Sequence, residues 1–531
     1  MKDASTGIGL ETLEKQPPFR LAAVRVDALA VATGVVTAAV AGVLGWFLNT
    51  WPPHEDETLA LFVGRGSLAD VLHTVIGERG GAPLHFLFAW GVVHLGGGLT
   101  ALRIVSLVFA VASVPLIVEL GARLADRATG IVAAVFAAAS WVFLFHGVFG
   151  RMYSLFLFTS LLSFLALLAR RYVLWGIALV LVLASHPYAV LVVAAQVLFV
   201  VLRQRERRAF MTLGAVAVAG IPFWWADVVL RNRFDVGIGG GGRRLGSPLS
   251  VLRYLWSVAG DFSSHAHVWS VCLLVLAVLG AALLVRRRPW AALLTACVVV
   301  VPALAFMLAT LRSTTSPEAR HLIFVLPFFS VLLALPLTTA ARAGKAAAAV
   351  AAVVAVVIVF GEVRWAQTKT PELFDGDPHG EAQARDAAAS WLATTSRRDD
   401  VLLGYEPVFL RAWEQNRSFS NHALPRADPA LFADALKRIH GPLGRGIWVF
   451  DASDTTNAEQ RSTIPFVLPE PTSEFEGRVY GPYLVIRSRQ PLETRARYIA
   501  VSKRVLELGR TLQINDADVN LHTILRARSR L

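Results

Sequence analysis

The sequence predicts an α-helical, multi-pass membrane protein that ends in a small extracytoplasmic α/β domain. Of its 531 residues, 55% are hydrophobic and only 17% are charged, and the mean hydropathy of +0.55 is too high for a soluble chain of this length. Runs such as 28–48, 266–285 and 346–361 approach the roughly 20 apolar residues that cross a bilayer as a helix. After residue 361 the apolar runs shorten, and Asp, Glu, Pro and Asn return.

The apolar runs divide into about eleven expected spans. Basic clusters between them, such as Arg170/Arg171 and Arg286 to Arg288, then fall on the same side of the membrane as the basic N-terminus, and that side must be cytoplasmic. The first run lacks a small-residue cleavage site, so we expect an uncleaved anchor. The expected spans lie near residues 27–49, 100–120, 130–147, 155–169, 172–185, 188–202, 211–230, 266–285, 290–311, 321–339 and 346–362.

Residues 83–98 are also apolar, but this stretch is short, carries two histidines and begins at a proline. We expect it to lie on the outer surface as an interfacial helix. Residues 51–99 then form one large outer loop, and an odd number of spans places the C-terminus outside. The expected domains are a transmembrane domain over 1–362, an extracytoplasmic α/β domain over 363–490 and a basic helical tail over 491–531, because strand-like and helical patterns alternate in the middle segment.

The net charge of +13 does not indicate a nucleic-acid partner, because the arginines lie in short segments between apolar runs, where they set topology. The two cysteines, Cys272 and Cys297, both lie inside apolar runs. Neither a disulfide framework nor a zinc cluster is therefore expected.

Polar residues gather on the predicted outer face. Carboxylates in an outer loop are often simply solvated, but polar groups that reach one face from separate helices usually line a cavity. Four ionisable residues, His54 to Glu57, follow the first span directly. The other members of this set come from the ends of later spans and are Arg151, Tyr153, His186, Tyr188, Arg320 and His321.

The ordered segments "HEDETLAL" (54–61), "APLHF" (82–86), "GRMYSL" (150–155) and "EARHLIF" (318–324) resemble the GT-C membrane glycosyltransferases. The likeness is to the branch of glycosyltransferase family 39 that holds protein mannosyltransferases and lipid A aminoarabinose transferases. It implies the GT-C fold and transfer of a sugar from a polyprenyl-phosphate donor to a glycan, lipid or protein acceptor outside the membrane. It also implies that Asp56 and Glu57 carry the reaction. Relatives often place an acidic residue just before the arginine of the third segment, where this chain has Val148, Phe149 and Gly150.

One carboxylate can suffice for such a transfer, because a phosphate leaves as a stable anion without being protonated. We expect Asp56 to accept the proton of the attacking hydroxyl, giving inversion, while Glu57 contacts the acceptor or positions Asp56. The departing phosphate needs fixed donors. Arg320 is the first candidate, followed by Arg151, His321, Arg243 and Arg244, with Tyr153, His186 and Tyr188 as further substrate-binding residues or simple helix anchors.

Several alternatives stay open from the residues alone. His54 and Glu55, with Asp56, could hold a divalent cation, although consecutive residues rarely all point at one ion; no other cofactor is expected. The loop 231–264 is either a glycine-rich linker or a lid over bound lipid phosphate. Rival functions are a transporter or flippase of lipid-linked sugars and a lipid-linked polysaccharide polymerase or ligase. Each of these alternative functions has membrane lipids as partners.

Overall fold

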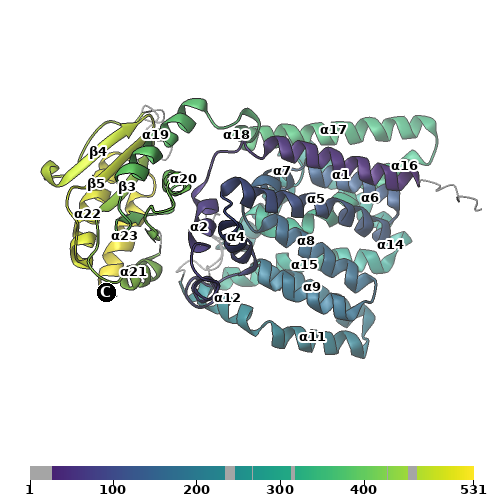
Figure 1. Ribbon diagram of the computed structural model, residues 1–531. Helices are drawn as coiled ribbons and strands as arrows, with labels where there is room; N and C mark the ends of the chain where they lie inside the picture. Colours follow the sequence, from purple (N-terminus) through teal and green to yellow (C-terminus); the bar gives the residue numbers. More distant parts are fainter. Residues whose placement is uncertain (1–26, 234–244, 266, 313–316, 427, 453–462) are drawn as a thin grey trace, which may run out of the picture.

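The computed structural model describes residues 27–531 apart from 234–244, 266, 313–316, 427 and 453–462. Long, roughly parallel helices form a bundle, and an α/β domain covers one end of it (Figure 1). This arrangement confirms the predicted fold class of a helical multi-pass membrane protein with a small C-terminal sheet. The chain is a multi-pass membrane protein.

Each expected span coincides with a helix or with a pair of consecutive helices. Among the described residues, six helices are long and apolar enough to cross a membrane, or up to eight spans if each of two bent pairs counts as one. The remaining expected spans are shorter apolar helices. The bundle helices are α1 (Ala28–Phe47), α5 (Leu99–Leu124), α6 (Arg127–Ala139), α7 (Trp141–Val148), α8 (Tyr153–Leu168), α9 (Tyr172–Ser185), α10 (Ala189–Phe199), η2 (Val200–Gln204), α11 (Arg207–Ala219), α12 (Ile221–Arg233), α14 (His267–Arg287), α15 (Pro289–Ala309), η4 (Ala319–Val325), α16 (Leu326–Ala341) and α17 (Lys345–Lys369).

The two bent pairs have local causes. Between α6 and α7 the chain turns by 67°, because Ser140 is extended (ψ 145°) and its hydroxyl accepts a hydrogen bond from the Phe143 amide, which starts a new helix. Between α11 and α12 the turn is 55°. There Pro222 cannot donate the backbone hydrogen bond that would continue α11. The first of these bends places α7 at the end of the bundle nearest the α/β domain (Figure 1), where Phe145 contacts Trp51 of the loop that follows α1.

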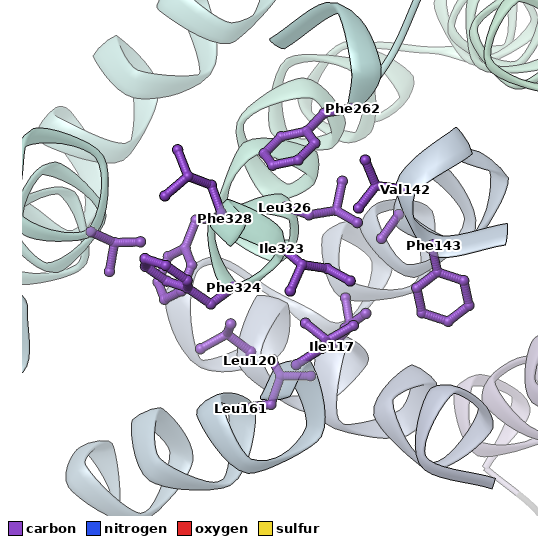
Figure 2. Packing of buried hydrophobic residues seen from close by; sticks show 14 of the residues in the cluster. Ile117, Leu120, Val142, Phe143, Leu161, Phe262, Ile323, Phe324, Leu326 and Phe328 are labelled. Carbon is purple, nitrogen blue, oxygen red and sulfur yellow. The ribbon is translucent and has the colours of Figure 1, made fainter. Parts of the chain in front are cut away.

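The core of the bundle is apolar and tightly packed. At one crossing, a Cβ on Gly280 of α14 would lie 1.9 Å from the Leu332 carbonyl oxygen of α16, so only glycine allows this approach. Large side chains from α5, α7, α8, η4 and α16 interdigitate in the centre. Figure 2 shows Ile117, Leu120, Val142, Phe143, Leu161, Phe262, Ile323, Phe324, Leu326 and Phe328 of this cluster.

The first outer loop is folded rather than open. It contains α2 (Glu55–Val63), α3 (Leu68–Leu72), η1 (His73–Arg79) and α4 (Leu84–His94). The last of these matches the short apolar segment expected to lie outside the bundle, and its 11 residues are too few to cross a bilayer. The outer loop shares one buried apolar cluster with the α/β domain, so it forms the joint between the bundle and that domain.

The α/β domain contains one five-stranded sheet with the order β2-β1-β3-β5-β4. β1 pairs in parallel with β2 and β3, whereas β5 pairs antiparallel with β3 and β4. One face packs against α19, α20 and the outer loop, and the other face packs against α21, α22 and α23. The elements are α19 (His379–Thr395), β1 (Val401–Leu403), α20 (Pro407–Gln415), β2 (His422–Leu424), α21 (Pro429–Arg438), β3 (Gly446–Asp451), β4 (Phe475–Tyr480), β5 (Tyr483–Ser488), α22 (Arg495–Thr511) and α23 (Ala517–Arg528).

Two boundaries differ from those expected. Helix α17 continues past residue 362 to Lys369 before α18 (Pro371–Asp375) leads into the α/β domain. Residues 491–531 are helical and basic, but they do not form a separate tail. Tyr498 and Ile524 of α22 and α23 are buried in the same core as Trp448 of β3, because an apolar stripe on each helix covers the sheet.

The basic clusters lie at the end of the bundle opposite the α/β domain (Figure 1). Several of their arginines pair with acids at neighbouring helix ends, for example Arg342 with Asp126 at 2.8 Å and Arg170 with Glu206 at 3.0 Å. A single basic end agrees with the side assignment made from sequence. The orientation of the termini across the membrane stays a prediction.

Candidate active site

The four ionisable residues after the first span form the start of helix α2. His54 is the N-cap: its Nδ1 accepts the Asp56 amide hydrogen bond at 3.1 Å, while Glu57 Oε2 accepts the His54 amide at 3.2 Å. This is a reciprocal capping arrangement. Three carboxylates in the first turn also complement the positive end of the helix dipole. The helix start therefore accounts for the clustering of the charges, and their individual contacts distinguish their roles.

Glu57 is fully buried and belongs to an ion-pair network. Arg103 of α5 donates from Nε to Glu57 Oε1 at 2.8 Å and from Nη2 to Oε2 at 2.6 Å. The same guanidinium donates to the carbonyl oxygens of Leu48, Trp51 and Pro52. Arg103 thus fastens the end of the first span to the start of α2. Both oxygens of Glu57 are therefore occupied by protein donors.

Gly150 completes this network from the bend between α7 and α8. Its backbone amide donates to Glu57 Oε1 at 2.7 Å, and a Cβ at this position would lie 3.0 Å from the same oxygen. The position where relatives often carry an acid is therefore used here for close backbone approach. A second carboxylate at residue 150 would meet Glu57 directly.

Glu55 points the other way and joins α2 to the α/β domain. Its Oε2 lies 2.6 Å from Arg426 Nη2, and its Oε1 accepts the Tyr405 amide at 3.2 Å. Arg426 also pairs with Glu406, and the Thr58 hydroxyl donates to the Tyr405 carbonyl. The C-terminal domain therefore clamps the first turn of α2. Sequence inspection gave no sign of Arg426 or Tyr405, which lie about 350 residues further along.

Asp56 is left between these two anchored neighbours. Its carboxylate accepts no hydrogen bond from the described residues, although its carbonyl accepts one from Arg151 Nη1 at 2.8 Å. The Arg151 charge lowers the pKa of Asp56, and His54, Arg320 and Arg79 act in the same direction against the opposing effect of burial. Asp56 is thus ionised at neutral pH. The structure brings together the three residues expected to meet, Asp56, Arg151 and Arg320.

The aromatic and histidine candidates form a wall beside this centre. His321 stacks on Tyr188 with ring centroids 4.5 Å apart and an angle of 6°, and His186 lies 5.4 Å from Tyr153. The Arg320 guanidinium lies 5.3 Å from the Tyr153 ring centroid. Four helix ends therefore converge, as their sequence positions predict. Buried polar atoms without a protein partner also gather here: Arg151 Nε, Arg320 Nε, His186 Nε2, His85 Nε2 and both ring nitrogens of His146.

Next to this wall is a cavity of about 720 Å³, which we call the bundle cavity. It lies between α7, α13 (Pro248–Asp261) and the start of η4. Trp141 and Phe145 form its apolar side, and its cations include Arg320 and Lys369. Arg320 lies 2.6 Å from Glu318, and Lys369 lies 2.6 Å from Asp261. Lys369 and Asp261 were not singled out in the sequence, because Lys369 follows the last expected span and Asp261 lies inside the loop 231–264.

The remaining candidates have different outcomes. Arg243 and Arg244 lie outside the described residues, and the second half of their loop is the helix α13 that lines the bundle cavity. Across the described ranges, no group of three or more His, Cys, Asp or Glu side chains is arranged to hold a metal ion. His54 and Glu55 have the capping and clamping contacts given above.

Comparison with solved structures supplies the fold name. The crystal structure of ArnT from Cupriavidus metallidurans in the apo state superposes with a TM-score of 0.54 over 86% of this chain and 98% of that chain, at 14% sequence identity. The chain has the GT-C fold. ArnT bound to undecaprenyl phosphate gives the same TM-score and identity over 87% and 98% of the two chains. The crystal structure of the Archaeoglobus fulgidus oligosaccharyltransferase tethered with an acceptor peptide has a TM-score of 0.45 at 12% identity, over 81% of this chain and 70% of that chain.

No family model matches the sequence, and no curated protein matches it. The GT-C assignment therefore depends on the arrangement of helices, outer loop and terminal domain rather than on sequence identity.

Proposed function

We propose that this protein is an inverting glycosyltransferase that moves a sugar from a polyprenyl-phosphate donor to an acceptor at the outer membrane surface, in cell-envelope glycan or glycoprotein synthesis. The observation that carries the proposal is the contrast within one helical turn. Glu55 and Glu57 are held by arginines, while Asp56 between them is ionised and accepts no hydrogen bond from the described residues. A carboxylate kept in this state is suited to accept a proton.

The bundle cavity suits a lipid-linked phosphate. Trp141 and Phe145 offer an apolar surface, and Arg320 offers a buried Nε without a protein partner. Helix α13 exposes Leu249, Leu252 and Trp256, and Leu249 also lines the cavity; exposed apolar side chains of this kind are typical of a helix that lies at a lipid interface. A polyprenyl chain could therefore reach the cavity from the bilayer while its phosphate meets Arg320.

The reaction needs one proton acceptor and a bound leaving group. An acceptor hydroxyl attacks the anomeric carbon as its proton passes to Asp56. The new carbon–oxygen bond forms while the bond from that carbon to the phosphate oxygen breaks, and the electron pair leaves with the polyprenyl phosphate. Arg320 and Arg151 stabilise the charge on the leaving phosphate. The anomeric configuration inverts because attack and departure occur on opposite faces.

Donor binding also prepares the base. In the free protein the Arg151 and Arg320 charges lower the pKa of Asp56, which makes it a weak proton acceptor. A phosphodiester anion between these arginines offsets their effect, so the pKa of Asp56 rises once the donor is bound. The carboxylate becomes a stronger base only when there is a sugar to transfer.

The test uses the full-length protein in nanodiscs with radiolabelled polyprenyl-phosphate mannose, arabinose and galactose, and with the matching nucleotide sugars. The proposal predicts that at least one lipid-linked sugar is cleaved from its phosphate. Consumption of nucleotide sugars alone would contradict it. A flippase would instead move the lipid across a vesicle bilayer with its sugar–phosphate bond intact, and a polymerase or ligase would require a polyprenyl-diphosphate glycan.

The location of the site also predicts a topology. Asp56 and the α/β domain lie at the end opposite the basic clusters, so we place both outside the cytoplasmic membrane and the N-terminus in the cytoplasm.

A further inference from the structure

A second cavity, of about 310 Å³, lies where the outer loop meets the α/β domain. We call it the outer groove, and its volume is within the range that holds small-molecule ligands. One side comes from α2, α3 and η1, and the other side comes from β2 and α21. The lining that matters here is Phe62, Arg65, Arg79, Tyr405, His422 and Arg438.

Arg65 is a cation that forms no ion pair with a carboxylate of the described residues. Its guanidinium lies between two aromatic rings, 3.9 Å from the Phe62 centroid and 4.2 Å from the Trp413 centroid. One nitrogen donates to Asn421 Oδ1 at 3.2 Å and weakly to a backbone carbonyl, while Nε and Nη2 are buried and find no hydrogen-bond partner in the described part of the chain. Burial lowers the pKa of Arg65 to about 9, with Arg417 adding to the effect and Glu414 opposing it. An anion nearby would compensate this cost.

Arg79 connects the outer groove to the reaction centre. It lies within hydrogen-bonding reach of the Tyr405 hydroxyl, and its charge is one of those that lower the pKa of Asp56. No described carboxylate forms an ion pair with it. Arg79 therefore lines the outer groove and also acts electrostatically on Asp56.

The acids around the groove do not neutralise these charges. Glu78 lies 2.7 Å from Arg438 and also contacts His73, and Asp70 accepts the Ser67 hydroxyl at 2.7 Å as part of a helix cap. The charges of Arg65 and Arg79 therefore give the groove an excess of positive charge. His422, with a buried Nδ1 that has no partner, adds a further polar group to the lining.

We propose that the outer groove binds the acceptor and that this acceptor is an anionic sugar bearing a carboxylate or a phosphate. The proposal rests on the proposed transfer function, and it names the acceptor class. Arginines recognise both anions through charge-assisted hydrogen bonds, and the Phe62 and Tyr405 rings offer the apolar surface on which sugar rings pack. The anion at Arg65 would direct a hydroxyl of the same molecule past Arg79 to Asp56.

Binding to the full-length protein in nanodiscs tests this without a donor. Two matched probe pairs separate the sources of the anion: tetragalacturonate with its methyl ester, and mannose 6-phosphate with mannose. We expect at least one anionic probe to bind about tenfold or more tightly than its neutral partner, since charged hydrogen bonds carry such a factor. Equal binding within both pairs, or binding of neither anion, would overturn the proposal.

Three variants locate the binding. Arg65→Gln and Arg79→Gln should each weaken the anionic probe about tenfold, and the half-buried Arg79 provides the readout if the buried Arg65 variant does not fold. Arg417→Gln is the matched control, because Arg417 lies 3.7 Å from the Trp413 ring but does not line the groove. Unchanged affinity in Arg79→Gln would place the anion elsewhere.

The two proposals fail separately. If lipid-linked sugars are cleaved but the groove shows no preference for anions, only the acceptor assignment falls. If the groove selects anions but every lipid-linked sugar is left intact, the transfer function falls and the groove is an anionic-sugar binding site.

Discussion

The bundle cavity and the outer groove differ in how their cations are balanced. In the bundle cavity Arg320 and Lys369 each lie beside an acid, and aromatic side chains form much of the wall. In the outer groove Arg65 and Arg79 form no ion pair with a described carboxylate. A site for a ligand anchored in the bilayer can bind it through an apolar wall and a modest positive charge. A site for an anionic ligand that arrives from water depends more on its own net positive charge. Asp56 is influenced by one cation of each cavity, Arg320 and Arg79.

The largest effect is expected at Asp56, on which one cation of each cavity acts. Asp56→Asn removes the proton acceptor but keeps the side-chain shape, so kcat should fall by about 10²- to 10⁴-fold. The thermal midpoint should stay close to that of the wild type, since the carboxylate accepts no hydrogen bond from the described residues. An undiminished transfer rate in this variant would remove Asp56 from the mechanism.

The neighbouring carboxylate should behave in the opposite way. Glu57→Gln leaves the buried Arg103 without its counterion, and breaking such a pair costs about 3–5 kcal/mol, seen as a large drop in the unfolding midpoint. Glu119→Gln is the matched control, because the Glu119–Arg123 pair is more than a third exposed on both sides and should cost at most about 1 kcal/mol. Equal shifts in the two variants would mean that Glu57 is not a structural anchor.

Asp56 and Glu57 show which features of the site could be predicted from the sequence and which could not. The span positions followed from hydropathy, and Asp56, Arg151 and Arg320 could be placed together because each follows or precedes a span on the same side. The difference between Asp56 and Glu57 was hidden, because it depends on Arg103 of α5 and on the Gly150 amide between α7 and α8, which lie far from α2 in the sequence. A buried partner leaves no local pattern in the sequence.

The α/β domain shows the same limit. The alternation of strands and helices in this domain could be predicted from the sequence. That residues 491–531 cover the sheet could not, because charged residues dominate the composition of this segment and its apolar stripe is narrow. The clamp between Arg426 and Glu55 joins positions 371 apart in the chain. Only tertiary structure brings such residues together.

Arg320→Gln tests the bundle-cavity side. Losing a charged donor to the carrier phosphate should lower kcat/KM for the lipid-linked donor about 10- to 100-fold. Arg342→Gln is the control, because it removes an arginine at the basic end of the bundle, where Arg342 pairs with Asp126. Similar kinetics in both variants would argue that the phosphate does not use Arg320.

The smallest expected effect is a change in pH dependence. Arg151 is the main cause that lowers the pKa of Asp56, and burial opposes it. Arg151→Gln should therefore raise the pKa, so that kcat/KM, which is lost as pH falls through this pKa, is lost at a higher pH than in the wild type. Arg253→Gln is the control, because Arg253 lines the bundle cavity but is not among the charges acting on Asp56. In this variant kcat/KM should fall at the same acidic pH as in the wild type. If the pH at which Arg151→Gln loses kcat/KM equals that of the wild type, Asp56 is not the proton acceptor that limits the reaction at low pH.

The most direct test of the two-cavity account is a cryo-electron-microscopy structure of the full-length protein with undecaprenyl phosphate. The account predicts phosphate density in the bundle cavity, within hydrogen-bonding distance of Arg320, with the outer groove free of lipid. Phosphate found only in the outer groove, or only at the basic end of the bundle, would contradict it.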